Sequence, residues 1–284
     1  MSVLRATGSG FRLTLRLWMA VAAYSVANAL VSFLGSFLPH QVVNDQIQKV
    51  PLPTDPNELL ALAIATLALF LIMVVSQLYL LGGVLGSLQR LLRKQPMQAG
   101  EFFRQCREKF WLTLKWGMVA FLLLLGIFCV GSFISGLLWA VTGHREEGRG
   151  LILAIGFGAT QLIGLPFLLY SPFFLLENGG RIRECFRGSF RFSMKRWFAT
   201  VRLIFLVSLI VAIFWLADFF LPAQGLGRVR AALGIPPFAK GLPSFFFNLV
   251  LLLPQAFFSV YLPAVLYAYY TGQTASAQEK GRTV

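Results

Sequence analysis

Long apolar segments alternate with short polar and basic connections along most of the 284-residue chain. An α-helix needs about 20 apolar residues to cross the hydrocarbon core of a bilayer. Six segments reach this length, so the pattern predicts six transmembrane helices. They cover residues 17–38, 59–81, 116–139, 151–175, 198–220 and 245–269.

The first apolar segment also has features of a secretory signal peptide. Arg5, Arg12 and Arg16 precede it, and residues 27–29 read Ala-Asn-Ala, similar to a cleavage site. However, the apolar run continues to Leu38 and further spans follow it. This favours an uncleaved transmembrane helix, with a cleaved signal peptide as the alternative.

Two longer connections, at residues 99–111 and 181–197, are predicted to be amphipathic helices. In the second, apolar residues recur at i, i+3, i+4 and i+7, and four cations recur every four residues on the other side. Such a helix can lie at the membrane surface with its cations near anionic headgroups. Alternatively, it packs across the cytoplasmic ends of the spans. The candidate headgroup contacts are Arg183, Arg187, Arg191 and Lys195, with Arg104 and Arg107 in the first helix.

The two connections resemble each other in sequence. Residues 101–106 and 184–189 both contain Glu-x-Phe-Arg with a small residue two positions after the arginine, and glycine precedes each segment. Each leads to a basic–aromatic pair, Lys115-Trp116 or Arg196-Trp197, at the start of the next span. The shared placement predicts an internal pseudo-repeat.

Composition and charge fit a membrane protein. Hydrophobic residues make up 57% of the chain and charged residues only 13%, against about 25% charged residues in a soluble domain. The net charge is +14, and 19 of the 25 Lys and Arg residues fall on one side of the predicted spans. The positive-inside rule makes this side cytoplasmic and places both termini there. It also accounts for the basic residues without nucleic-acid binding.

The stretch from Gln98 to Leu209 resembles a family of six-span bacterial inner-membrane proteins of the YciC type, which is related to the membrane domain found beside some glycerophosphodiester phosphodiesterases. The likeness lies in two Glu-x-Phe-Arg helices, each leading into a span, and in a closing span that ends in Leu266-Tyr267. The resemblance implies six spans in a bacterial inner membrane. It implies no particular chemistry, because most members of the family lack an assigned activity.

Few residues in the chain could carry catalysis. The two histidines, His40 and His144, both lie outside the predicted spans, and the three cysteines form no CxxC motif. Cys129 lies within an apolar run and is expected in the core. An active site needs convergent acid, base, nucleophile or metal-binding groups. We therefore expect no enzyme activity, no metal site and no cofactor.

Three amides fall near the middle of predicted spans: Asn28, Gln161 and Gln255. A buried amide must find a hydrogen-bond partner, so these side chains are expected to bond between helices. Alternatively, they line a polar site between spans one, four and six. Glycines 82, 83 and 86 are expected to allow close approach of helices.

The sequence as a whole predicts one integral membrane domain, residues 1–284. Its fold is an all-α polytopic bundle of six transmembrane helices and two cytoplasmic amphipathic helices. The expected function is non-catalytic and acts through membrane lipids, anionic ones above all, through a membrane protein partner or through a homo-oligomer. The alternative is a small transporter or lipid-handling protein.

Overall fold

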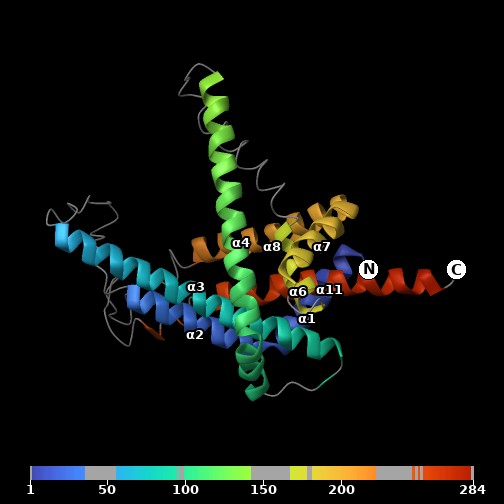
Figure 1. The fold of residues 1–284 in the computed structure, drawn as a ribbon. Coiled ribbons are helices and arrows are strands. Elements are labelled where there is room, and N and C mark those ends of the chain that lie inside the picture. Colours follow the sequence, from blue (N-terminus) through green and yellow to red (C-terminus); the bar gives the residue numbers. More distant parts are fainter. Residues whose placement is uncertain are drawn as a thin grey trace.

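The computed structural model describes residues 2–35, 56–93, 95, 99–141, 167–177, 181–221, 245–246, 249 and 252–282. Within these residues the chain is helical and contains no strand, which confirms the all-α class. The helices are α1 (Val3–Arg16), α2 (Trp18–Gly35), α3 (Pro56–Leu92), α4 (Ala99–Val141), α6 (Ser171–Glu177), α7 (Ile182–Lys195), α8 (Trp197–Leu221) and α11 (Leu253–Arg282) (Figure 1).

Two helices are long and apolar enough to cross a membrane: residues Leu59–Leu92 of α3 and Gly100–Val141 of α4. They contain the predicted spans 59–81 and 116–139. Helices α1 and α2 meet at a bend of 74° and count as a third candidate if the bent pair is one span. The predicted spans 198–220 and 245–269 fall in α8 and partly in α11, whereas most of 151–175 lies outside the described residues.

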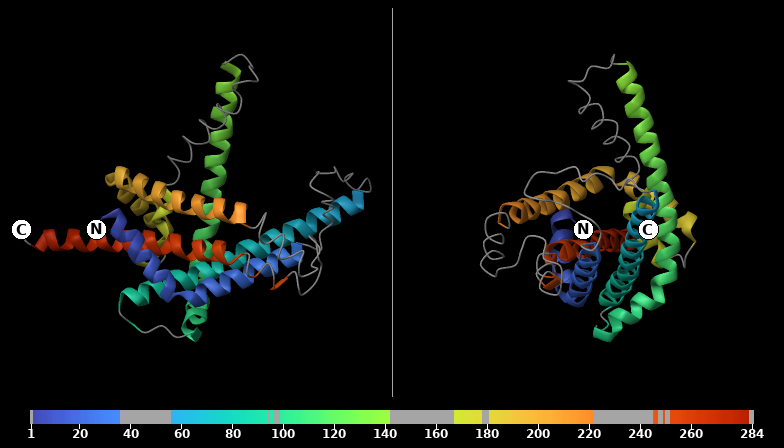
Figure 2. Two further views of the ribbon diagram at one scale, coloured as in Figure 1. Left: turned by 180° about the vertical axis from the view of Figure 1, so that it is seen from behind. Right: turned by 90° about the vertical axis from the view of Figure 1, so that its left-hand side faces the viewer.

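Helices α3 and α4 cross closely at Gly82, Gly83 and Gly86 of α3. A Cβ atom at Gly83 would overlap Cys106 and Phe102 of α4, and one at Gly86 would overlap Gln105. At the same crossing, the Thr113 hydroxyl donates to the Leu78 carbonyl at 3.1 Å. The close approach expected of these glycines is therefore present. Beyond the crossing, the outer half of α4 stands away from the other helices (Figures 1 and 2).

Helix α4 differs from the sequence prediction because it is continuous from Ala99 to Val141. We expected an amphipathic helix at 99–111 and a separate span at 116–139. Residues 111–116 contain neither glycine nor proline, so nothing interrupts the backbone hydrogen bonding between the two parts.

By contrast, α7 ends where the second basic–aromatic pair was predicted to begin a span. Arg196 has φ −127° and ψ 36°, which are not helical. Its guanidinium lies 4.6 Å from the centre of the Phe192 ring and donates to Gln273 of α11 at 3.3 Å. These contacts fix the break, and α8 begins at Trp197.

The core lies around α11, which packs against α1 and α2 (Figure 2). Its largest buried side chains are aromatic: Tyr269 and Tyr270 of α11 meet Tyr170 and Phe173 from the region of α6. Tyr270 also donates a hydrogen bond to the carboxylate of Glu177. This aromatic cluster joins the end of the chain to its middle.

Candidate functional site

Helix α7 buries its apolar face inside the protein. Phe192 is 8% exposed, and its ring packs edge-on against Tyr170, with centroids 4.7 Å apart, and near Tyr270 and Phe174. Ser189 accepts a hydrogen bond from the Tyr170 backbone N–H at 3.1 Å. The apolar face of α7 therefore contacts α6 and α11, as in the packed alternative, and does not lie free for a membrane.

The four cations of α7 occupy its outer face. Arg183, Arg187, Arg191 and Lys195 are all exposed. Among the described residues, none of the four makes an ion pair. One large apolar side chain of α7, Met194, is also exposed (49%), so a lipid contact of this face would be made mainly by charge.

The first basic segment has a different environment. Arg104 and Arg107 of α4 are exposed. Arg104 forms ion pairs with Glu101 and with Glu108, the latter at 3.5 Å, and Arg90 of α3 also pairs with Glu101. Part of the positive charge here is thus neutralised within the protein.

Helix α1 was not predicted from the sequence, and it presents three faces. Small residues, Ala6, Gly10 and Thr14, are buried against α11. Large apolar side chains form an exposed stripe that continues into α2: Leu4, Phe11, Leu15 and Trp18, of which Trp18 is 64% exposed. The arginines form a second exposed stripe: Arg5, Arg12 and Arg16.

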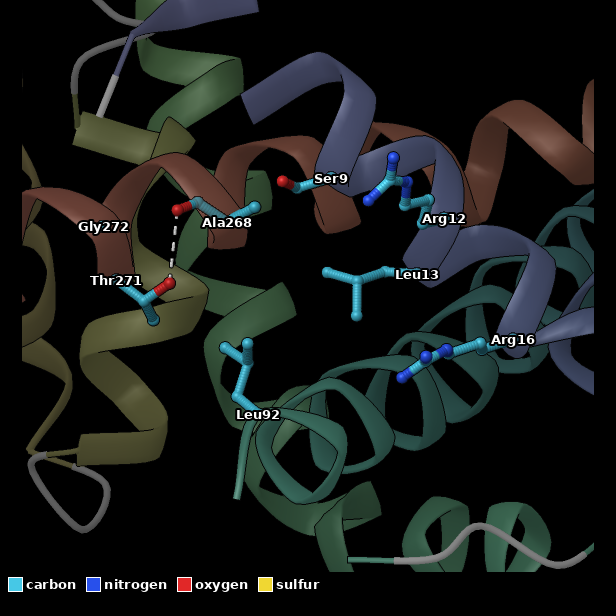
Figure 3. A pocket seen from close by; sticks show the side chains of 8 residues that line it. All are labelled: Ser9, Arg12, Leu13, Arg16, Leu92, Ala268, Thr271 and Gly272. Carbon is cyan, nitrogen blue, oxygen red and sulfur yellow. Dashed lines mark hydrogen bonds between the residues drawn. The ribbon is translucent and has the colours of Figure 1, made fainter. Parts of the chain in front are cut away.

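A cavity of about 310 Å³ lies beside the arginine stripe, between α1, α11 and the end of α3. Figure 3 shows Arg12, Leu13 and Arg16 of α1 across from Ala268 and Thr271 of α11. No acidic side chain lines this cavity. Within the described part of the chain, neither arginine forms an ion pair, so both guanidinium groups have donors available for a ligand.

A second cavity, of about 460 Å³, lies on the other side of α1. Its walls are mainly apolar and aromatic, with Phe11 of α1, Ile210 of α8 and Phe257 of α11 among them. Gly8 also lines it, and no heavy atom lies within 4 Å of where a Gly8 Cβ would stand. Arg12 lines both cavities, so one arginine borders a cavity with two arginines in its lining and a cavity with mainly aromatic and apolar walls.

The predicted amides are not brought together as one group in the described residues. Asn28 accepts a hydrogen bond from the Gln77 side chain of α3 at 2.7 Å. Gln255 is exposed and has no hydrogen bond to Asn28, and Gln161 lies outside the described residues. Gln77 lies near the C-terminal end of the second predicted span. It was not selected from the sequence, although it stands in an apolar run.

The cysteines show no catalytic arrangement in the part of the chain described. Cys106 and Cys185 are buried, and burial raises the pKa of the Cys185 thiol, which keeps it protonated and weakly nucleophilic. Cys129 is exposed, not in the core as expected, because the outer half of α4 packs against few described side chains. No group of three or more His, Cys, Asp or Glu side chains is gathered within the described residues.

Sequence signals for α1 were present. Ser2 caps the helix by accepting a hydrogen bond from the Arg5 N–H at 3.3 Å. The spacing of Arg5, Arg12 and Arg16 by seven and four residues places them on one helical face. From the sequence, these arginines were interpreted as topology signals or as the basic start of a signal peptide, and the helix that contains them was not predicted.

Comparisons of the chain with protein-family models, with curated proteins and with solved structures found no match. The two long apolar helices define a membrane protein.

Proposed function

We propose that the chain is a six-span protein of the bacterial inner membrane with both termini in the cytoplasm, and that it acts through lipids or membrane protein partners without catalysis. The observation that carries the membrane location is the exposure of large apolar side chains along α3 and α4. They include Ile64, Leu67 and Phe70 of α3 and Met118, Phe121 and Phe133 of α4. Apolar surface of this extent is stable only in a membrane or an interface.

The distribution of charge supports the orientation. The basic segments belong to α1, the end of α3, the start of α4 and α7. The exposed apolar halves of α3 and α4 carry no Lys or Arg between residues 59 and 89 or between 116 and 141. A cytoplasmic location of the basic segments satisfies the positive-inside rule. The resemblance to the YciC-type family supports the same six-span arrangement.

Action through anionic lipid follows from the outer face of α7. Each Lys or Arg near the cytoplasmic leaflet contributes about 1 kcal/mol of attraction to anionic lipids. Four exposed cations on one face of α7 would hold such lipids near the protein, or would attract an acidic surface of a membrane protein partner or a second copy.

Reporter fusions test the topology directly. Fusions after Pro51, Glu147 and Gln224 should give external activity, and fusions after Gln98 and Gly188 should give cytoplasmic activity. Reversal at two of these five sites would refute the six-span arrangement. The lipid role of α7 is tested in fusion proteins that insert with the expected pattern. If replacing Arg183, Arg187, Arg191 and Lys195 by Gln left the lipid enrichment of these proteins unchanged at every salt concentration, the lipid role of α7 would be refuted.

A further inference from the structure

Helix α1 has the properties of a helix that lies in a membrane interface. Its exposed apolar stripe borders its arginine stripe, and its third face is occupied by α11. The 74° bend between α1 and α2 sets α1 nearly across the direction of α2. If α2 crosses the bilayer, α1 therefore runs close to the membrane plane, where apolar side chains enter the acyl region and arginines meet phosphate groups.

The two cavities beside α1 share one residue but differ in their polar groups. Arg12, Arg16 and Ser9 line the first cavity together with apolar side chains such as Leu13 and Leu92. The apolar cavity is lined by Phe11, Phe257 and other hydrophobic side chains, with Arg12 at its border. Both volumes fall within or near the range of about 300–1,000 Å³ that small-molecule sites occupy.

We propose that α1 and α11 form a binding site for one anionic glycerophospholipid of the cytoplasmic leaflet. The phosphate accepts hydrogen bonds from Arg12 and Arg16, and an acyl chain enters the cavity lined by Phe11 and Phe257. The proposal rests on the membrane location proposed for α1, but not on the cations of α7.

A soluble phosphate would use only half of this arrangement. Arginine binds phosphate oxygens through paired donors, and these charge-assisted hydrogen bonds are the strong ones. They do not explain why an aromatic cavity adjoins the same guanidinium or why Leu15 and Trp18 remain exposed beside it. A molecule with a phosphate at one end and hydrocarbon at the other satisfies both halves.

The first test is a titration of the full-length protein with phosphatidylglycerol in a non-ionic detergent, read by native mass spectrometry. The wild type should bind one lipid at the lowest concentrations, and zwitterionic phosphatidylcholine should bind more weakly. Arg12→Gln should raise the dissociation constant about tenfold, because a hydrogen bond from a charged donor is lost. Arg5→Gln is the matched control, since Arg5 belongs to the same stripe but lines neither cavity.

The second test fills the apolar cavity without disturbing the protein. Gly8→Leu adds a side chain where no heavy atom lies within 4 Å, so it should occupy the cavity and weaken phosphatidylglycerol binding about tenfold. Gly126→Leu is the control, because Gly126 is also helical and has open space around its Cβ position. It should leave the first lipid bound as in the wild type.

Several results would overturn the site. Equal losses from Arg5→Gln and Arg12→Gln would mean that the arginines act only as a diffuse charge. Competition by soluble glycerol phosphate at concentrations similar to the lipid, with no effect of Gly8→Leu, would mean a free phosphate site. A failure of the topology fusions would refute the six-span proposal, whereas correct topology without a first tightly bound lipid would refute this site alone.

Discussion

Helices α1 and α7 have similar sequences in outline but opposite environments. Each has 14 residues, a basic stripe and an apolar face. Helix α7 buries its aromatic face, with Phe192 in the aromatic cluster, and exposes cations. Helix α1 buries small residues such as Gly10 and leaves Phe11 and Leu15 exposed.

The difference shows that amphipathic spacing does not identify the surface that covers the apolar face. In α7, α6 and α11 supply that surface. In α1, α11 contacts the small residues instead, because only they allow its backbone to approach that of α11. The helix with the more evident sequence signal is therefore the less suited to membrane insertion, and the helix overlooked in the sequence is the better candidate.

The largest expected effect concerns the buried face of α7. Phe192→Ala should lower the free energy of unfolding by about 3–5 kcal/mol, because it leaves a cavity between Tyr170, Phe174 and Tyr270. The measurement is the thermal midpoint of the purified protein in detergent micelles. Met194→Ala, at a position 49% exposed, is the control and should change little. Equal thermal midpoints for the two variants would contradict the packing of the apolar face of α7 inside the protein.

The next effect concerns the small-residue face of α1. Gly10→Leu should cost about 1–3 kcal/mol, because its Cβ would overlap the backbone of Val265 in α11. Gly8→Leu makes the same chemical change on the open side of α1 and has the same gain in helix propensity. The thermal midpoint of Gly10→Leu, measured by circular dichroism, should therefore lie below that of Gly8→Leu. Equal midpoints would mean that α1 is not held against α11 as described.

A smaller effect concerns the side-chain hydrogen bond between α2 and α3. The hydrogen bond between Asn28 and Gln77 should give a coupling free energy of about 0.6 kcal/mol in a double-mutant cycle with leucine at each position. A parallel cycle with Gln255, which is exposed, should be additive. Coupling of Asn28 to Gln255 in place of Gln77 would support the cluster that the sequence predicted and would contradict the pair in the structure.

The smallest effect is expected at the outer face of α7. Replacing Arg183, Arg187, Arg191 and Lys195 together by Gln should change the free energy of unfolding by less than about 0.5 kcal/mol, since exposed charges without close partners contribute little to stability. Arg196→Gln is the informative contrast, because Arg196 contacts both Gln273 and the Phe192 ring. Its thermal midpoint should fall below that of the fourfold variant. A lower thermal midpoint for the fourfold variant would mean that the outer cations of α7 contribute to the packing of the protein.

Some features could be predicted from the sequence because they depend on local chemistry. The apolar runs of residues 59–81 and 116–139 lie in α3 and α4 since length and hydropathy alone make such segments helical. The close approach at Gly83 was also expected, because glycine has no side chain and lets a neighbouring helix pack close to the backbone. The spacing in 182–195 likewise predicts a helix with one basic and one apolar face, and α7 has both.

The partners of these surfaces required the tertiary structure. The sequence contains Asn28 and Gln77 but not the register of α2 against α3 that joins them. It contains Arg12 and Phe257, which are far apart along the chain, but not the crossing of α1 and α11 that places them at neighbouring cavities. Helical periodicity is set by residues three or four apart, whereas these contacts depend on how whole helices approach one another. The sequence by itself therefore determined that this protein is helical and apolar enough for a membrane, and only the packing of its helices decided which amphipathic face is buried and which remains available to bind.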